Sequence, residues 1–273
     1  MTTKHLAVRK HLAGGIASVA SLLALISASF AHQTFLWPQK FVWDEGKLVT
    51  VSLTSALSFP NLEHGPAKDR IDLTAIVTGG MPVDEVSFSE NETVLDVQFM
   101  PARTGFSRIA VSSKPRAGDI APEDAEEYFD EIGASAPVRA AFDALPGSPP
   151  LKRSYSKHAK LFICIEICGI GNKAATEPVG QPLEFVAVGD SAAVFKLLRD
   201  GEGLPEHAVT IVTTAGDTVD LSTAEGGTFV VPEGLTGAIM LTAVVITLPD
   251  TADGIYHSDY ATLTTEQGIN TID

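Results

Sequence analysis

Short stretches in which apolar and polar residues alternate constrain the fold of this 273-residue chain most strongly. Residues 49–54 read Val-Thr-Val-Ser-Leu-Thr, and residues 95–99 read Leu-Asp-Val-Gln-Phe. A period of two places successive side chains on opposite faces, so each stretch predicts a strand with one buried and one wet face. Turn residues separate such stretches along most of the chain. Further candidate strands cover residues 105–112, 159–167, 183–188, 209–212, 228–231, 239–246 and 260–263.

One segment, residues 122–145, is expected to be helical instead. Pro122 followed by two acidic residues is typical of a first helical turn, because proline needs no amide partner there and acids complement the helix dipole. A second short helix is expected from Ser135. We therefore predict a mainly β protein with two antiparallel β-sandwich parts and a short helical insertion. The expected divisions are residues 32–118, an insertion over 119–150, and a C-terminal sandwich over 151–273.

The first 31 residues have the pattern of a secretory signal peptide. Three basic residues precede an apolar run over residues 12–26, which falls short of the roughly 20 residues that a membrane span needs. Ser29 and Ala31 are small residues suited to positions −3 and −1 of a cleavage site. Cleavage after Ala31 predicts a periplasmic protein that begins at His32. No later apolar run is long enough to span a membrane, so we expect no span after this removal.

The remaining chain is strongly acidic. Without residues 1–31, 16 Lys and Arg face 34 Asp and Glu, a formal charge of −18. Nucleic acids and anionic lipid surfaces attract clustered basic residues, so neither is an expected partner. An acidic surface concentrates cations around the protein, although it specifies no particular metal.

Cys164 and Cys168 are the only cysteines of the chain. A disulfide is the usual interpretation in an exported protein. Four residues of a straight strand span about 13 Å, whereas bridged Cα atoms lie within about 7 Å, so the bond requires a turn. Gly169 and Gly171 favour one. Two free thiols and a role in metal binding are the alternatives, and two thiolates alone are too few for a structural zinc site.

Five histidines follow residue 31, and none belongs to an H-E-x-x-H motif, so any metal site must combine distant segments. His32 is the strongest candidate, because cleavage would give it an α-amine beside an imidazole that suits several transition metals. His64 lies in an expected loop that can reach the beginning of the first strand. His158 and His257, at the starts of two expected strands, are further candidates. Each candidate has the alternative of a surface or structural histidine, and His207 is expected in an exposed turn.

Familiar catalytic motifs are missing from the sequence. It contains no G-x-S-x-G elbow, no P-loop and no G-x-G-x-x-G after a strand. Its acidic residues are numerous but scattered. We therefore expect a binding protein and not an enzyme.

Several stretches, taken together, resemble the DUF4198 family of exported bacterial proteins. Residues 31–38 are similar to its A-H-x-x-W-L-x-P opening with the aromatic residues displaced, and residues 153–160 are similar to its R-x-Y-S-x-H-x-K element. Residues 177–186 are similar to its R-P-L-G-x-P-L-E-x-V element. Further similarities cover residues 59–60, 68–71, 198–209 and 259–264.

The resemblance implies an Ig-like or transthyretin-like sandwich in the C-terminal part. Family members are often described as periplasmic components of cobalt or nickel uptake, so it also implies a periplasmic, metal-related role. His32 and His158 match family histidine positions, whereas His64 and His257 lie where the family varies.

Our leading hypothesis is a periplasmic protein that binds a divalent transition metal and delivers it to a membrane transporter. Nickel or cobalt is favoured, with copper or zinc as alternatives, and the candidate ligands are His32, His64, His158 and His257. The rival hypothesis is a secreted β-sandwich interaction module without metal. A third is a copper-dependent oxidase that uses the same N-terminal chelate.

Overall fold

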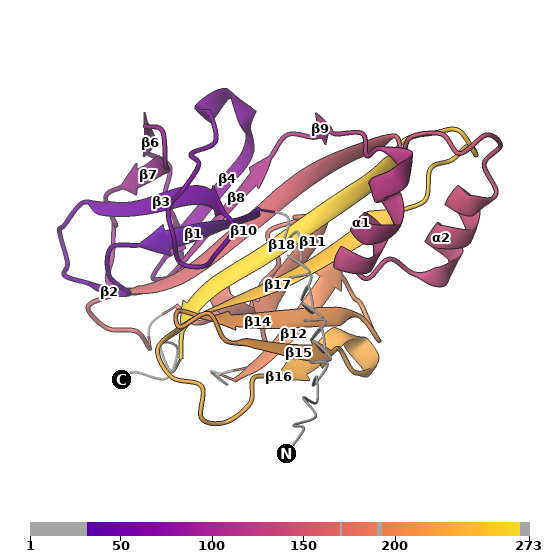
Figure 1. Cartoon of the computed structure of the whole chain (residues 1–273). Coiled ribbons are helices and arrows are strands. Elements are labelled where there is room, and N and C mark those ends of the chain that lie inside the picture. The colour runs from indigo at the N-terminus through magenta and orange to yellow at the C-terminus, as the bar shows by residue number, and fades with distance from the viewer. Residues whose placement is uncertain (1–31, 170, 190–192, 268–273) are drawn as a thin grey trace, which may run out of the picture.

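The computed structural model describes residues 32–169, 171–189 and 193–267, and in these residues three β-sheets are stacked in layers (Figure 1). The largest sheet contains, in spatial order, β15 (Thr218–Ser222), β14 (Ala208–Thr213), β17 (Ala238–Thr247), β18 (Tyr256–Glu266), β10 (Arg153–Ile165), β8 (Gly105–Ser113), β4 (Ile71–Thr78) and β5 (Met81–Pro82). The short strands β2 (Val42–Trp43) and β9 (Arg116–Ala117) also pair with β10.

The two smaller sheets cover different parts of the large one. The first contains, in order, β1 (Gln33–Pro38), β3 (Val49–Ala56), β7 (Leu95–Phe99) and β6 (Val86–Glu90). The second contains β11 (Leu183–Ala187), β12 (Val194–Arg199) and β13 (Glu202–Gly203), with β16 (Thr228–Val230) also beside β12. In Figure 1 the long strands β10 and β18 run side by side between these two layers.

Strand β10 contributes to two hydrophobic cores, because a smaller sheet packs on each of its faces. Leu161 and Ile163 lie in the core under the sheet of β1, β3, β7 and β6. Phe162 and Cys164 lie in the core under the sheet of β11 and β12. Alternation along a strand sends neighbouring side chains to opposite faces, so one strand joins both sandwich parts.

Most of the expected strands are confirmed. The alternating stretches 49–54 and 95–99 form β3 and β7, which are paired antiparallel. The fold class, mainly β with antiparallel sheets and few helices, is confirmed as well. Two ladders differ, since β10 runs parallel to β18, with His158 opposite Ala261, and also parallel to the short strand β2. Hydrophobic alternation reports which face a residue occupies and carries no information on the direction of the partner strand.

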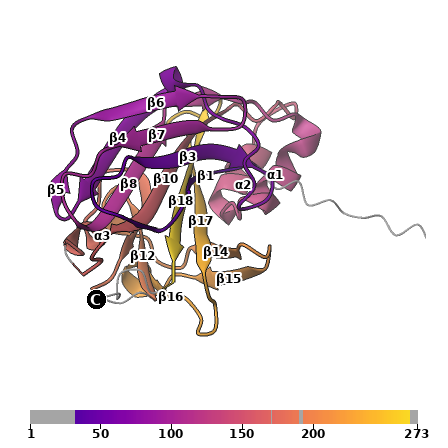
Figure 2. The same cartoon turned by 90° about the vertical axis from the view of Figure 1, so that its left-hand side faces the viewer.

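The expected helical segment is also confirmed, and its hydrophobic residues pack against β17 and β18. Phe129, Val138 and Tyr256 belong to one buried cluster that joins the helices to the large sheet. Figures 1 and 2 show α1 and α2 together at one side of the molecule. The helical elements of the described residues are η1 (Lys68–Arg70), η2 (Pro122–Asp124), α1 (Ala125–Glu131), α2 (Ala136–Asp143), α3 (Lys173–Thr176) and η3 (Glu225–Gly227).

Cys164, at the end of β10, forms a disulfide with Cys168, and their Cα atoms are 5.1 Å apart. The chain therefore turns back after the strand, as the bond requires. Because both sulfur atoms are used in this bond, neither is available as a thiolate ligand for a metal.

The expected signal peptide, residues 1–31, lies outside the described residues. Within the part of the chain that the structure describes, no helix is both long and apolar enough to cross a membrane.

Candidate metal centre

His32 immediately precedes β1, and contacts with other strands fix this end of the chain. The backbone carbonyl of His32 accepts a hydrogen bond of 2.5 Å from Nζ of Lys157 in β10. The hydroxyl of Thr34 lies 2.5 Å from that of Ser55, and the carbonyl of Thr34 accepts a hydrogen bond of 2.8 Å from Oγ1 of Thr262. Because Gln33 is paired with Ala56, His32 lies beside the end of β3.

His64 belongs to the loop between β3 and η1, which turns back along the end of β3. Two backbone hydrogen bonds, 2.8 and 3.1 Å long, join Ser55 and His64 in an antiparallel bridge. The next residue, Gly65, lies against the neighbouring chain so closely that a Cβ atom there would be 2.5 Å from the backbone of Val94. This close packing fixes the loop and places His64 near the beginning of β1.

Glu63 is held by the same loop. Its backbone N–H donates to Oγ1 of Thr54 at 3.2 Å, and its carboxylate Oε2 accepts a hydrogen bond of 3.0 Å from the backbone N–H of Leu57. The side chain is half-buried. Both contacts are local, so Glu63 and His64 are positioned together.

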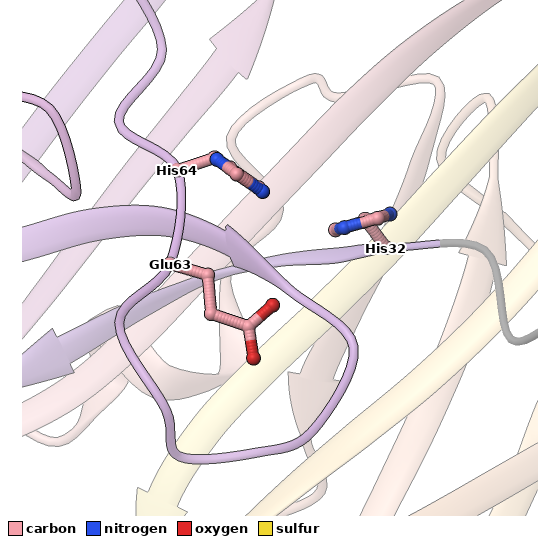
Figure 3. Close-up of side chains that lie close together, drawn as sticks. All are labelled: His32, Glu63 and His64. Atoms are coloured by element: carbon pink, nitrogen blue, oxygen red, sulfur yellow. The ribbon is translucent and has the colours of Figure 1, made fainter.

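The side chains of His32, Glu63 and His64 come together at the edge of the first small sheet (Figure 3). One potential ligand atom of each lies within 4.8 Å of those of the other two, and the imidazole centroids are 5.4 Å apart. A metal at about 2.0–2.2 Å from each donor spans donor atoms up to about 4.4 Å apart, so small side-chain movements would close the site. Two imidazoles and a carboxylate form a donor set that suits divalent first-row metals and leaves coordination positions open.

A pocket of about 460 Å³ adjoins this cluster and is lined by His32 and His64. Three basic side chains, those of Arg70, Arg116 and Lys157, also line it. Burial, together with the positive charges of Arg153 and Arg116, lowers the pKa of Lys157 to about 8. The lining thus contains three basic side chains and no acidic one.

The other two candidate ligands, His158 and His257, lie in a different group on the opposite face of β10. Tyr155, Lys157 and Ala159 line the pocket, so alternation directs His158 away from it. His158 is 3% exposed, and its ring bonds to Oγ of Ser112 at 2.9 Å and to Oδ1 of Asp259 at 3.0 Å.

His257 contacts the same aspartate. Its ring lies 2.7 Å from Oγ of Ser154 and 3.2 Å from Oδ1 of Asp259. Both ring nitrogens of each histidine in this group thus have a hydrogen-bond partner. The structure brings His32 and His64 together, and it brings neither His158 nor His257 to them.

Asp259 is the centre of the buried group. Burial by itself would raise the pKa of this carboxyl, but hydrogen bonds from His158 and Arg199 and the charge of Arg199 lower it to about 2. Arg199 Nη1 contacts Oδ2 at 2.6 Å. Asp259 is therefore a carboxylate at neutral pH, held by partners from three strands.

Glu63 was not among the residues expected from the sequence, and the expected position of His207 was wrong. Glu63 directly precedes His64, and a glutamate beside a candidate ligand in a turning loop was an available signal. His207, expected in an exposed turn, is half-buried: its Nε2 lies 2.9 Å from the carbonyl oxygen of Val244, and burial lowers its pKa. The turn lies against β17, which the local sequence does not reveal.

Comparisons with known proteins give one family match. The model of a domain of unknown function, DUF4198, matches residues 29–245. No curated protein matches the chain.

Three solved structures that match the chain have low sequence identity and low TM-scores. A Bacteroides ovatus mixed-linkage glucan utilization protein, SGBP-B, is 14% identical with a TM-score of 0.21, over 85% of this chain and 46% of that one. The BSP domain of a biofilm-associated protein is 12% identical with a TM-score of 0.21, over 85% and 30%. The D0-D1 domain of intimin is 11% identical with a TM-score of 0.19, over 84% and 96%. The chain spans less than half the length of the first two proteins, and matches at these TM-scores carry no argument about function.

Proposed function

This chain belongs to the DUF4198 family, and we propose that it is an exported protein that binds a divalent transition metal. Nickel and cobalt are the leading candidates, and copper and zinc are the alternatives. The proposal is that of a periplasmic carrier without turnover, which delivers its metal to a membrane transporter.

The observation that supports this proposal is the convergence of His32, Glu63 and His64 from two segments about 30 residues apart. Cleavage after Ala31 would add the α-amine of His32 to these donors. These three or four donors are carried by backbone segments that are already fixed in the fold. A divalent metal can therefore bind to them without a folding step.

The experiment is isothermal titration of the mature protein, beginning at His32, with nickel, cobalt, copper and zinc. We expect one metal per chain, with affinity that falls as the pH drops because the amine and the imidazoles must lose their protons to bind. A variant with one alanine added before His32 separates the α-amine from the ring, so its affinity should fall at least about tenfold. His207→Ala, which alters a histidine elsewhere, is the matched control and should bind as the wild type does.

Equal weak binding by the wild type and by the alanine-extended variant would overturn the proposal. An interaction module without metal, the alternative function, predicts that result for all four metals.

A further inference from the structure

The pocket beside the cluster carries a charge opposite to that of the chain as a whole. Arg70, Arg116 and Lys157 line it, and none of its lining residues is Asp or Glu. The whole chain, in contrast, has 34 acidic and 19 basic residues. A bare divalent cation that enters from this side is repelled by three like charges. The pocket is thus built for an anion.

The three basic side chains have no acidic partner among the residues that the structure describes: no carboxylate lies within ion-pair distance of them. Arg70 donates from Nη2 to the backbone carbonyls of Lys114 and Pro115, at 2.7 and 3.3 Å, and Lys157 donates to the carbonyl of His32. These bonds hold two of the cations in place without neutralising them. Arg116 is exposed at the rim.

We propose that this pocket binds a small di- or tricarboxylate that is itself a ligand of the metal, so that the chain captures the metal as an anionic chelate. The inference rests on the proposed function of the His32, Glu63 and His64 cluster. The histidines would hold the metal and leave coordination positions for oxygen atoms of the chelator, while its remaining carboxylates pair with Arg116 and Lys157. Thr34 and Ser55 also line the pocket, and since one of their hydroxyls donates to the other, the remaining O–H can donate to the same anion. A volume of about 460 Å³ is within the usual range for a small-molecule site.

Equilibrium dialysis with radiolabelled nickel and radiolabelled citrate tests this inference on the mature protein. We expect both labels to be retained in a 1:1 ratio when both are present, and citrate alone to be retained at least tenfold more weakly. Arg116→Ala should lower the citrate-dependent retention at least tenfold, and it should not lower the affinity for free nickel, because it removes a positive charge. Arg116→Lys should restore part of the loss. Arg103→Ala removes an exposed arginine that does not line the pocket, and it should behave as the wild type does.

Two results overturn the inference, and they are distinguishable. In the first, nickel binds alone, citrate only removes it from the protein, and Arg116→Ala has no effect. The proposal that the metal is captured as a chelate is then wrong, whereas the proposed metal site is retained. If nickel is not retained with or without citrate, the proposed function fails and the chelate fails with it.

Discussion

The two histidine groups of this protein differ in what their side chains already bind. In the buried group, both ring nitrogens of His158 and of His257 have hydrogen-bond partners, and Asp259 accepts from both rings. In the cluster at the sheet edge, the rings of His32 and His64 make no hydrogen bond among the described residues, and they lie near each other and near Glu63.

The difference shows that a histidine position alone does not identify a ligand. A metal needs a free lone pair, and a nitrogen that is already paired inside a protein gives one up only at the cost of a broken buried hydrogen bond. The buried group therefore has the character of a structural network. The edge cluster has the character of a binding site. Three predictions test this division.

The largest expected effect comes from removing the carboxylate at the centre of the buried group. Asp259→Ala leaves Arg199 and two histidines without their shared acceptor, so the free energy of unfolding should fall by about 3–5 kcal/mol. Urea unfolding followed by circular dichroism measures the change.

Asp84→Ala is the control for this substitution, because Asp84 is exposed and its loss should change the stability by no more than about 0.5 kcal/mol. The affinity of Asp259→Ala for nickel should equal that of the wild type while the protein is folded. A large drop in that affinity would mean that the two groups are not separate.

A pair of histidine substitutions should give opposite results in the two groups. His64→Ala removes a proposed ligand, so the affinity for nickel should fall about 100-fold, or about 2.7 kcal/mol, with little change in stability. His257→Ala should leave the affinity unchanged and lower the stability by about 1–2 kcal/mol, because two hydrogen bonds are lost. Titration calorimetry and urea unfolding on both variants measure the two quantities, and a loss of affinity in His257→Ala would break the division.

The smallest expected effect is a dependence of stability on acid pH that comes from the buried group. The pKa of Asp259 is lowered to about 2 in the folded chain from an ordinary value of 3.8, so the native state binds this proton more weakly than the unfolded state does. The carboxylate therefore stabilises the fold above about pH 4, and this contribution, about 2 kcal/mol, is lost as the pH falls from about 4 to 2.

Comparing urea unfolding of the wild type and of Asp259→Asn between pH 2 and pH 5 isolates this contribution from those of the other carboxyls. The wild type should lose more stability than the variant over this range. Parallel curves would show that Asp259 titrates alike in the folded and unfolded states.

Local patterns in the sequence were sufficient for the individual elements. The alternation over residues 49–54 and 95–99 gave the correct faces of β3 and β7, because their buried residues lie in one core. Pro122 and the acids after it marked the beginning of the helical segment. These features depend on residues close in the chain, and such residues are visible in a sequence.

Contacts between distant strands were not predictable in this way. The partners of His158, Ser112 and Asp259, come from β8 and β18. Other residues of β10 also contact distant elements: Arg153 stacks over Tyr128 of α1, and Lys160 pairs with Glu184 of β11. The 153–160 stretch thus contributes both to the interior, through His158 and Lys160, and to the proposed metal site, through Lys157.

From the sequence, we could say only that the loop containing His64 was able to reach His32. The meeting of the two histidines depends on the Ser55–His64 bridge and on the close approach of Gly65 to Val94, which no local pattern encodes.

Because β10 is buried on both faces, it limits how this protein can be shortened. A fragment that stops before Arg153 would leave one edge of β8 unpaired. It would also remove the β10 side chains that pack against β1 and β3. A fragment that begins after Ile165 would leave β18 without its parallel neighbour. Residues 153–165 belong to the cores of both sandwich parts. A shortened version for expression, grafting or fusion therefore has to include them, whichever part is wanted.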